Sequence, residues 1–255
     1  MTAPPAILVA VPAHDEQSSV VTCVRAVLAA VRVALDAGQI RSATIGVAAH
    51  RCTDRTAARA SAVLEFSTLP DHVTGVVARD EIPSRVGAVR ARLIDRLAAL
   101  PGPSTDWVLS TDADSIVPEN WVTDLMRIGA SRGADALAGP VELVGWHGSQ
   151  EALQRYRAIV AAGMTSDGHR HVYAANLAVR MAAYRAVGGF REVEHGEEHA
   201  LLNDLRAASF RVVSVLRPVV QTSSRLRGRA PGGLADLLRS LHEDQRLGAS
   251  SGTAS

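Results

Sequence analysis

The chain has 255 residues, of which 47% are hydrophobic, 21% charged and 4% aromatic. These proportions predict one soluble globular domain and exclude a disordered chain, a collagen-like repeat and a disulfide scaffold. The formal net charge of +1 gives no electrostatic case for nucleic-acid binding. All 27 basic residues are arginine, which excludes Schiff-base chemistry on a lysine and a P-loop lysine.

The chain carries two cysteines, Cys23 and Cys52, which are too few for a disulfide framework, so a reducing cytosol is the expected setting. No basic leader precedes the first apolar run, residues 6–11, and no signal peptide is predicted. The longest apolar stretch, 20–35, contains two arginines and falls short of the roughly 20 apolar residues of a membrane span. We therefore expect a cytoplasmic protein that could contact a membrane only at its surface.

The first part of the chain alternates short apolar runs with helical patterns, which predicts βαβ units around a mainly parallel sheet. Strands are expected at residues 6–11, 43–49, 72–78 and 106–111. Helices are expected at 16–37, at 84–100, and from Thr53, a potential cap, to about residue 65.

After the fourth strand the pattern loosens. Helices are expected at 118–131, 150–162, 181–187 and 197–208, and extended segments at 135–144, 173–180 and 210–216. From Arg217 the chain is rich in Arg, Gly and Ser, followed by an amphipathic segment, 234–247, and a tail, 248–255, that should be disordered. We expect one domain over residues 1–216, with a first half to about residue 114 and a second half from 115.

Asp112 and Asp114 form a D-x-D pattern directly after the fourth expected strand. The carboxyl end of a buried strand is where open α/β sheets bind ligands. Hard carboxylate oxygens suit Mg²⁺ or Mn²⁺, which usually also recruits substrate phosphates. The pair therefore indicates a metal site, with a solvated turn as the alternative.

Several short motifs follow the expected strands in order. In the first half these are Val11-Pro-Ala-His-Asp-Glu16, Cys52-Thr-Asp-Arg-Thr56 and Ser110-Thr-Asp-Ala-Asp114. In the second half they are Ala175-Asn-Leu-Ala-Val-Arg180, Gly188-Gly-Phe190 and Gly196-Glu-Glu-His199. In this order the motifs resemble those of family 2 glycosyltransferases, which have the GT-A fold, over roughly residues 6–216. The resemblance implies a nucleotide-sugar (donor) half to about residue 114 and an acceptor half over residues 115–216. The resemblance implies a Rossmann-like, mainly parallel α/β sheet flanked by helices, followed by a C-terminal loop and helix (217–255).

The resemblance also implies a metal-dependent transfer of a sugar from a UDP-, GDP- or dTDP-sugar to an acceptor hydroxyl, with inversion. Pro12, Ala13, His14 and Glu16 would line the nucleoside pocket. Asp112 and Asp114 would hold Mn²⁺ or Mg²⁺ and the ribose-diphosphate, with Asp114 favoured as the direct metal ligand. Glu198 stands at the position of the family's general base, which accepts the proton of the acceptor hydroxyl. Glu197 beside it could orient the base or the acceptor.

Arginines supply further candidate contacts to the nucleotide. Arg85 and Arg90 stand where the family places residues near the nucleotide. Arg225, Arg227 and Arg229 alternate in a glycine-rich stretch that could close over a diphosphate, because guanidinium groups bind phosphate through two hydrogen bonds. A solvated arginine face is the alternative for each of them.

The sequence departs from the family pattern at three positions. His50 stands two residues before Cys52, where the family often has an acidic residue that contacts the base, so the donor base is left open. Asp15 stands where Asn is frequent. Glu198 replaces an Asp and is one methylene longer.

Three other functions are compatible with part of the sequence. A sugar-phosphate nucleotidyltransferase shares a related sheet, but it should carry a glycine-rich signature after the first strand. A non-catalytic nucleotide-sugar-binding protein has no reason to keep Glu198 together with Asp112 and Asp114. His195-Gly-Glu-Glu-His199 matches the H-x-x-E-H pattern of zinc hydrolases, but Gly196 inside a helix costs about 1 kcal/mol relative to Ala.

The remaining expectations concern single side chains and partners. His169 and His171 are expected as exposed loop residues, and Cys52 as a small buried packing residue. Trp146 either stacks on an acceptor sugar or lies in the core, and the core is favoured. The amphipathic segment 234–247 can dock on the domain, on a second copy in a homodimer or on a membrane surface, and its mixed charge favours protein. No motif identifies the acceptor.

Overall fold

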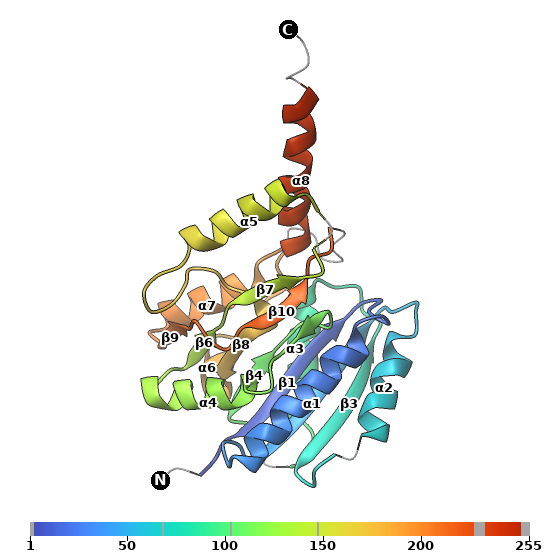
Figure 1. Cartoon of the computed structure of the whole chain (residues 1–255). Coiled ribbons are helices and arrows are strands. Elements are labelled where there is room, and N and C mark those ends of the chain that lie inside the picture. Colours follow the sequence, from blue (N-terminus) through green and yellow to red (C-terminus); the bar gives the residue numbers. More distant parts are fainter. Residues whose placement is uncertain (1–2, 68, 103, 147, 227–232, 251–255) are drawn as a thin grey trace.

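The structure, a computed structural model, describes residues 3–67, 69–102, 104–146, 148–226 and 233–250, the last eight of these by their backbone only. Figure 1 shows a twisted sheet with helices on both sides and a C-terminal helix that extends away from the body. None of the helices in the described part of the chain is long and apolar enough to cross a membrane.

Within these residues the large sheet has seven strands. Their spatial order is β3 (Val73–Asp80), β2 (Ser42–His50), β1 (Ala6–Ala13), β4 (Trp107–Ser110), β8 (Leu177–Arg180), β6 (Ala136–Ala138) and β9 (Val212–Ser214). β3, β2, β1 and β4 are parallel, and β8 pairs antiparallel with both β4 and β6. The expected mainly parallel α/β sheet is therefore confirmed. From β1 the chain moves outward to β2 and β3 and then returns to the other side of β1 as β4, which makes the β1–β4 edge a topological switch point.

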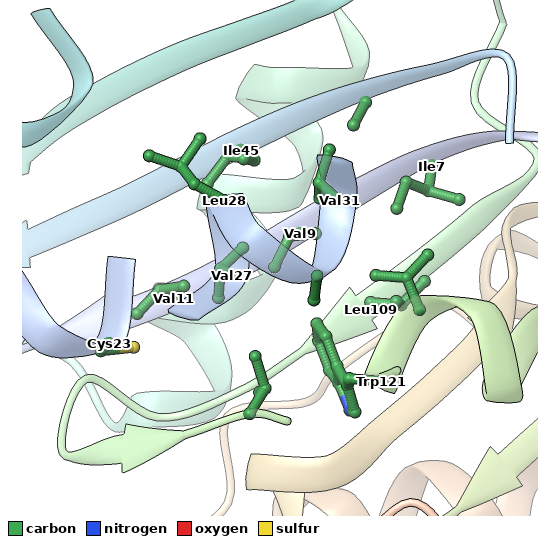
Figure 2. Close-up of a cluster of buried hydrophobic side chains, with 14 of the residues drawn as sticks. Ile7, Val9, Val11, Cys23, Val27, Leu28, Val31, Ile45, Leu109 and Trp121 are labelled. Carbon is green, nitrogen blue, oxygen red and sulfur yellow. The ribbon is translucent and has the colours of Figure 1, made fainter. Parts of the chain in front are cut away.

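Alternate residues of the first strand pack into two different cores, because successive side chains of a strand point to opposite faces. Ile7, Val9 and Val11 belong to a cluster covered by α1 (Val20–Asp36), α2 (Thr56–Phe66) and α4 (Trp121–Arg132). Figure 2 shows Val9 and Val11 near Val27 and Val31 of α1. Leu8 and Ala10 belong to a second cluster, covered by α3 (Val86–Ala98), α6 (Met181–Ala186) and α7 (Glu197–Ala207). Burial on both faces explains why residues 6–11 are continuously apolar.

A second sheet of three described strands lies beyond the carboxyl end of β4. Its order is β5 (Ser115–Ile116), β10 (Val220–Ser223) and β7 (Val141–Val144). Asn176, in the short 3-10 helix η1 (Ala174–Asn176), connects the two sheets. Its Nδ2 donates to the carbonyls of Pro140 and Pro218 at 2.8 Å, and its Oδ1 accepts from Trp121 Nε1 at 2.9 Å. This fully buried amide fixes the chain at the start of β7 and β10, and thereby the course of the residues that follow β10.

Two helices lie outside the small sheet. α5 (Gln150–Ala162) contacts α8 (Leu234–Ser250), and Leu238 of α8 is fully buried. The amphipathic C-terminal segment therefore docks on its own domain. α8 extends three residues into the tail for which disorder is predicted, and residues 251–255 lie outside the described part.

Most elements lie where the sequence pattern predicts them, with three corrections. The expected strand 135–144 is two strands in different sheets, because the chain turns at Gly139-Pro140 and proline lacks the N–H that would continue a ladder. β5 and β10 were not predicted. The helix expected from Thr53 begins at Thr56, and Asp54 Oδ1 accepts from the Thr56 amide at 2.9 Å in place of a Thr53 cap.

Candidate active site

A cavity of about 700 Å³ opens at the switch point between β1 and β4. The loops after β1 and β4, the first turns of α3 and α7, the last residues of β10 and parts of α5 and α8 line it. The carboxyl ends of parallel strands are where such sheets bind ligands, and the size suits a small-molecule site. The cavity contains most of the candidate residues that the sequence predicts.

The loops after β1 and β2 are tied together on one side of the cavity. His14 Nδ1 donates to the His50 carbonyl at 2.8 Å, and Asp15 Oδ1 accepts from the amides of Thr53 (2.7 Å) and Asp54 (3.2 Å). Asp15 has a positive φ of 51°, a conformation that asparagine and aspartate adopt more readily than most residues. The motif that begins at Pro12 and the motif that begins at Cys52 thus form one structural unit.

Cys52 is half-exposed and its Sγ accepts from the Asp15 amide at 3.4 Å, so the expectation of a plain buried packing residue is wrong. Asp15, Cys52 and Asp54 also form the one group of three potential metal ligands found among the described residues. Their polar atoms are engaged in the hydrogen bonds between the two loops, including those from Asp54 Oδ1 to Thr56. The group is therefore a structural tie.

Asp112 is held from behind by a buried arginine. Arg90 of α3 is 2% exposed, and its Nη2 donates to Asp112 Oδ1 at 2.5 Å while its Nη1 donates to Ser110 Oγ at 2.6 Å. Arg90 Nε lies 3.5 Å from Glu197 Oε1, and the guanidinium lies over the Phe190 ring. The partners of Arg90 in the structure are thus the protein's own carboxylates.

Asp114 and Glu16 share a second arginine that comes from the end of the chain. Arg225 Nη1 lies 2.6 Å from Glu16 Oε1, and its Nη2 lies 3.1 Å from Asp114 Oδ2. Burial raises the pKa of Asp114 to about 6, although the Arg225 guanidinium acts in the opposite direction. Two carboxylates at the cavity are thus arranged around one cationic group.

The first turn of α7 brings two glutamates to the opposite wall. Both line the cavity, and Glu197, which is 6% exposed, also pairs with Arg90. Burial and the Glu197 carboxylate raise the pKa of Glu198 to about 7. A carboxylate that titrates near neutral pH is suited to accept a proton.

The zinc-hydrolase alternative is wrong. Gly196 adopts a left-handed φ of +73° and precedes α7, so His195 lies outside the helix that carries Glu198 and His199. An H-x-x-E-H site binds its metal through histidines of one helix. These three side chains do not form a metal-binding group within the described residues.

The other predicted site residues have different outcomes. Pro12, Ala13, His50 and Arg85 line the cavity, and Arg85 stands exposed at its rim directly before α3. Arg227 and Arg229 lie outside the described residues. Trp146 is half-buried, belongs to neither core cluster, and its Nε1 donates to the Ser149 carbonyl at 3.0 Å, so the favoured core prediction for it is wrong.

The sequence analysis missed an aromatic part of the lining. Tyr156, His171 and Tyr173 line the cavity, and the neighbouring His169 is 5% exposed. The expectation that His169 and His171 are exposed loop residues is therefore wrong, since His169 is buried and His171 half-buried. The signal that could have revealed them is the alternation of rings at positions 169, 171 and 173, which places them on one face of an extended segment.

The chain has the GT-A fold of nucleotide-sugar glycosyltransferases, in a single domain. No protein-family model and no curated protein matches its sequence. Among solved structures it is similar to TarS of S. aureus, with a TM-score of 0.62 at 12% identity over 85% of this chain and 36% of that one.

Two further structures contain residues 1–349 of TarS. The complex with UDP-GlcNAc has a TM-score of 0.61 at 13% identity and covers 92% of this chain and 65% of that chain. The complex with UDP has a TM-score of 0.57 at 13% identity, with 96% and 72% covered. The chain spans about a third of the first TarS structure and about two thirds of the second, and at these identities the likeness shows the fold.

Proposed function

We propose that the protein transfers a sugar from a nucleotide-diphospho-sugar to an acceptor hydroxyl. One observation carries the proposal: Asp112, Asp114 and Glu198 line one cavity at the switch point of a GT-A fold. Structural neighbours with this fold are complexes with UDP-GlcNAc and UDP, which supports a nucleotide-sugar donor here.

The donor would lie against the loops after β1, β2 and β4. Pro12 to His14 and His50 would form the wall against which the nucleobase lies. The hydrogen bond between Asp15 and the Thr53 amide holds that wall in place. The guanidinium group of Arg225 can bind the diphosphate through two charge-assisted hydrogen bonds. Arg90, which is buried behind Asp112, would orient that carboxylate without contacting the nucleotide itself.

Glu198 would act as the general base. Its carboxylate takes the proton of the acceptor hydroxyl while the hydroxyl oxygen forms a bond to the anomeric carbon. The bond between that carbon and the diphosphate oxygen breaks, and the nucleoside diphosphate leaves with the electron pair. Attack from the side opposite the diphosphate would invert the anomeric configuration. Glu197, engaged with Arg90, would keep the first turn of α7 in position.

The residues around Asp114 fit a divalent cation. Asp114 and Glu16 are hard oxygen donors that already surround a cationic group, the Arg225 guanidinium. Asp114, with Asp112 beside it, would hold Mn²⁺ or Mg²⁺. Such a cation, when bound, stabilises the negative charge that develops on the departing diphosphate.

The test is donor turnover by the full chain. Thermal shifts with UDP, GDP, dTDP and ADP, each with and without Mn²⁺, identify the nucleobase of the donor. The matching nucleotide-sugar is then assayed for release of the nucleoside diphosphate, with Glu198→Gln as the control. Release that depends on Glu198 supports the proposal. Pyrophosphate release from a nucleoside triphosphate would indicate a nucleotidyltransferase instead, and nucleotide binding without turnover would indicate a non-catalytic binding protein.

A further inference from the structure

The two ends of the cavity differ in chemistry. The end near β1 and β4 carries the carboxylates and arginines described above. The other end is formed by α5, the segment 170–175 and the start of α8. We call it the apolar wall and define it by Tyr156, Ile159, Val160, Tyr173, Leu234 and Leu237. Among the described lining residues from these three segments, Arg170 is the only Arg, Asp or Glu.

A row of flat rings adjoins this wall. The centroids of His169 and His171 lie 6.2 Å apart, and those of His171 and Tyr173 lie 6.0 Å apart, with interplanar angles of 23° and 27°. His171 Nε2 donates to the Val160 carbonyl at 3.0 Å, which ties the row to α5. A Cβ at Gly163 would collide with the His171 ring, so α5 approaches the row closely. The row is thus held in place by α5, and two of its rings, His171 and Tyr173, line the cavity.

The wall offers few polar groups to a ligand. Burial raises the pKa of Tyr156 and of Tyr173, and the buried Tyr156 hydroxyl has no hydrogen-bond partner among the described residues. Ile159 and Leu237 remain 41% and 37% exposed. Large aliphatic side chains left exposed at the rim of a cavity indicate a surface that a ligand covers.

The wall and Glu198 line the same cavity, so a ligand on the wall shares that cavity with the proposed base. A sugar or polysaccharide acceptor would leave hydroxyl groups without partners against Ile159, Val160 and the two leucines, which is unfavourable. The rings of His171 and Tyr173, which line the cavity, suit a ligand that is itself aromatic, because aromatic rings pack favourably against one another. The cavity of about 700 Å³ must also hold part of the donor, which leaves room inside it for a small molecule.

We propose that the acceptor is a small, flat, hydrophobic molecule with a hydroxyl group, such as a phenol, which lies on the apolar wall with its hydroxyl toward Glu198. This inference rests on the proposed function, because it takes Glu198 as the base. It assigns specificity for the acceptor body to the wall and leaves specificity for the donor to the loops after β1 and β2.

The test measures binding separately from transfer. The probe is 4-methylumbelliferone, a fluorescent flat phenol, titrated with the full chain. Ile159→Asp and Leu237→Asp each place a charge on the wall at an exposed position, where the fold should tolerate it. Phe66→Asp is the matched control, because Phe66, the last residue of α2, is 87% exposed and does not line the cavity. UDP affinity is measured for all four chains.

The proposal expects at least a tenfold weaker affinity for the phenol in both wall variants, no change in the control, and UDP affinity within twofold throughout. Equal phenol binding by wild type and wall variants would overturn it. Displacement of the phenol by methyl glucoside would also overturn it, because that would indicate a sugar acceptor. Stronger displacement by a linear alkyl alcohol than by 2-naphthol would overturn it as well, because that would indicate a lipid chain. Phenol binding that depends on the wall, without turnover of any nucleotide-sugar, would contradict the proposed function and leave the apolar site standing.

Discussion

Arg225 and Asp114 form an ion pair of 3.1 Å across the mouth of the candidate active site, and the same guanidinium lies 2.6 Å from Glu16. The arginine follows β10, near the end of the domain, whereas its two partners follow β1 and β4. In the structure this guanidinium supplies the positive charge that two clustered carboxylates require. A divalent cation at Asp114 would therefore compete with Arg225 for the same oxygens, and Arg225 would become free to bind a diphosphate.

Replacing Arg225 with Ala should separate these two roles. Without the guanidinium, Mn²⁺ alone should bind more tightly, because Asp114 loses the positive charge that lies 3.1 Å from its carboxylate. Nucleoside diphosphate in the presence of Mn²⁺ should bind about tenfold more weakly, which is the loss of one charge-assisted contact. Isothermal titration calorimetry measures both, with Arg127→Ala, an exposed arginine paired with Asp124, as the control. Weaker binding of Mn²⁺ would contradict the competition.

Replacing Asp114 with Asn keeps the size of the side chain and removes its charge. We expect loss of Mn²⁺-dependent nucleotide binding, while binding without metal stays within a fewfold of wild type. Thermal shift with nucleoside diphosphate, with and without Mn²⁺, measures the difference. Asp54→Asn, in the loop tie, is the comparison, because Asp15, Cys52 and Asp54 should not hold the catalytic cation. Unchanged metal-dependent stabilisation in Asp114→Asn would place the cation elsewhere.

The fold follows from sequence where the pattern is local and strong. The double burial of β1 is visible as the continuous apolar run from Ala6 to Val11, and the same holds for the strands beside it. β5 and β10 have two and four residues, and their pairing partners lie about a hundred residues away, so no local periodicity marks them. The division of the expected strand 135–144 depends on Asn176, whose side chain occupies the space beside Gly139.

The candidate site, like the fold, could be predicted from the sequence only where its residues stand in local motifs. Asp112, Asp114, Glu198 and the residues after β1 were found because each stands in a motif next to an element end. The partners of Arg225 were not predictable, because they are set by the course of β10 and by the ties that Asn176 makes to Pro140 and Pro218. The apolar wall combines three segments that carry no shared motif, and only the structure brings them together.

The rate of sugar transfer should rise with pH and reach half its maximum near pH 7. Burial and Glu197 raise the pKa of Glu198 to about 7, and the base is active only when deprotonated. Below that pH the rate should fall about tenfold per pH unit, and Glu198→Gln should be lower by roughly 10²–10⁴ without this dependence. Single-turnover kinetics from pH 5.5 to 8.5 measure it. A flat profile in wild type would mean that another group is the base.

The raised pKa of Glu198 also predicts that the stability of the fold falls as pH rises, whereas the rate of transfer rises. A carboxyl group whose pKa is higher in the folded state stabilises the fold at low pH, and this contribution is lost as pH rises through about 7. Glu198→Gln should therefore gain stability relative to wild type between pH 5.5 and pH 8. Urea denaturation at the two values gives the difference in unfolding free energy. An identical difference at both would show that Glu198 does not titrate in this range.

Gly87 lies at the closest approach of α3 to the segment that leads into α7. A Cβ at this position would collide with the Arg191 carbonyl and would approach Glu197 Cβ to 2.9 Å. Because backbone and a buried side chain cannot give way, Gly87→Ala should destabilise the fold by about 1–3 kcal/mol and push the first turn of α7 away from α3. That displacement would weaken the contact between Arg90 and Glu197 and move Glu198 relative to the donor. We expect the maximal rate to fall while donor affinity changes little, measured as kcat and KM together with urea denaturation.

Gly133→Ala, where a Cβ would meet no atom within 4 Å, is the comparison for the loss of a glycine alone. Gly133 has a positive φ of 56°, so that variant carries backbone strain without contact to the site. If both variants lose stability alike and both keep the wild-type rate, the packing of α3 against α7 does not position the base.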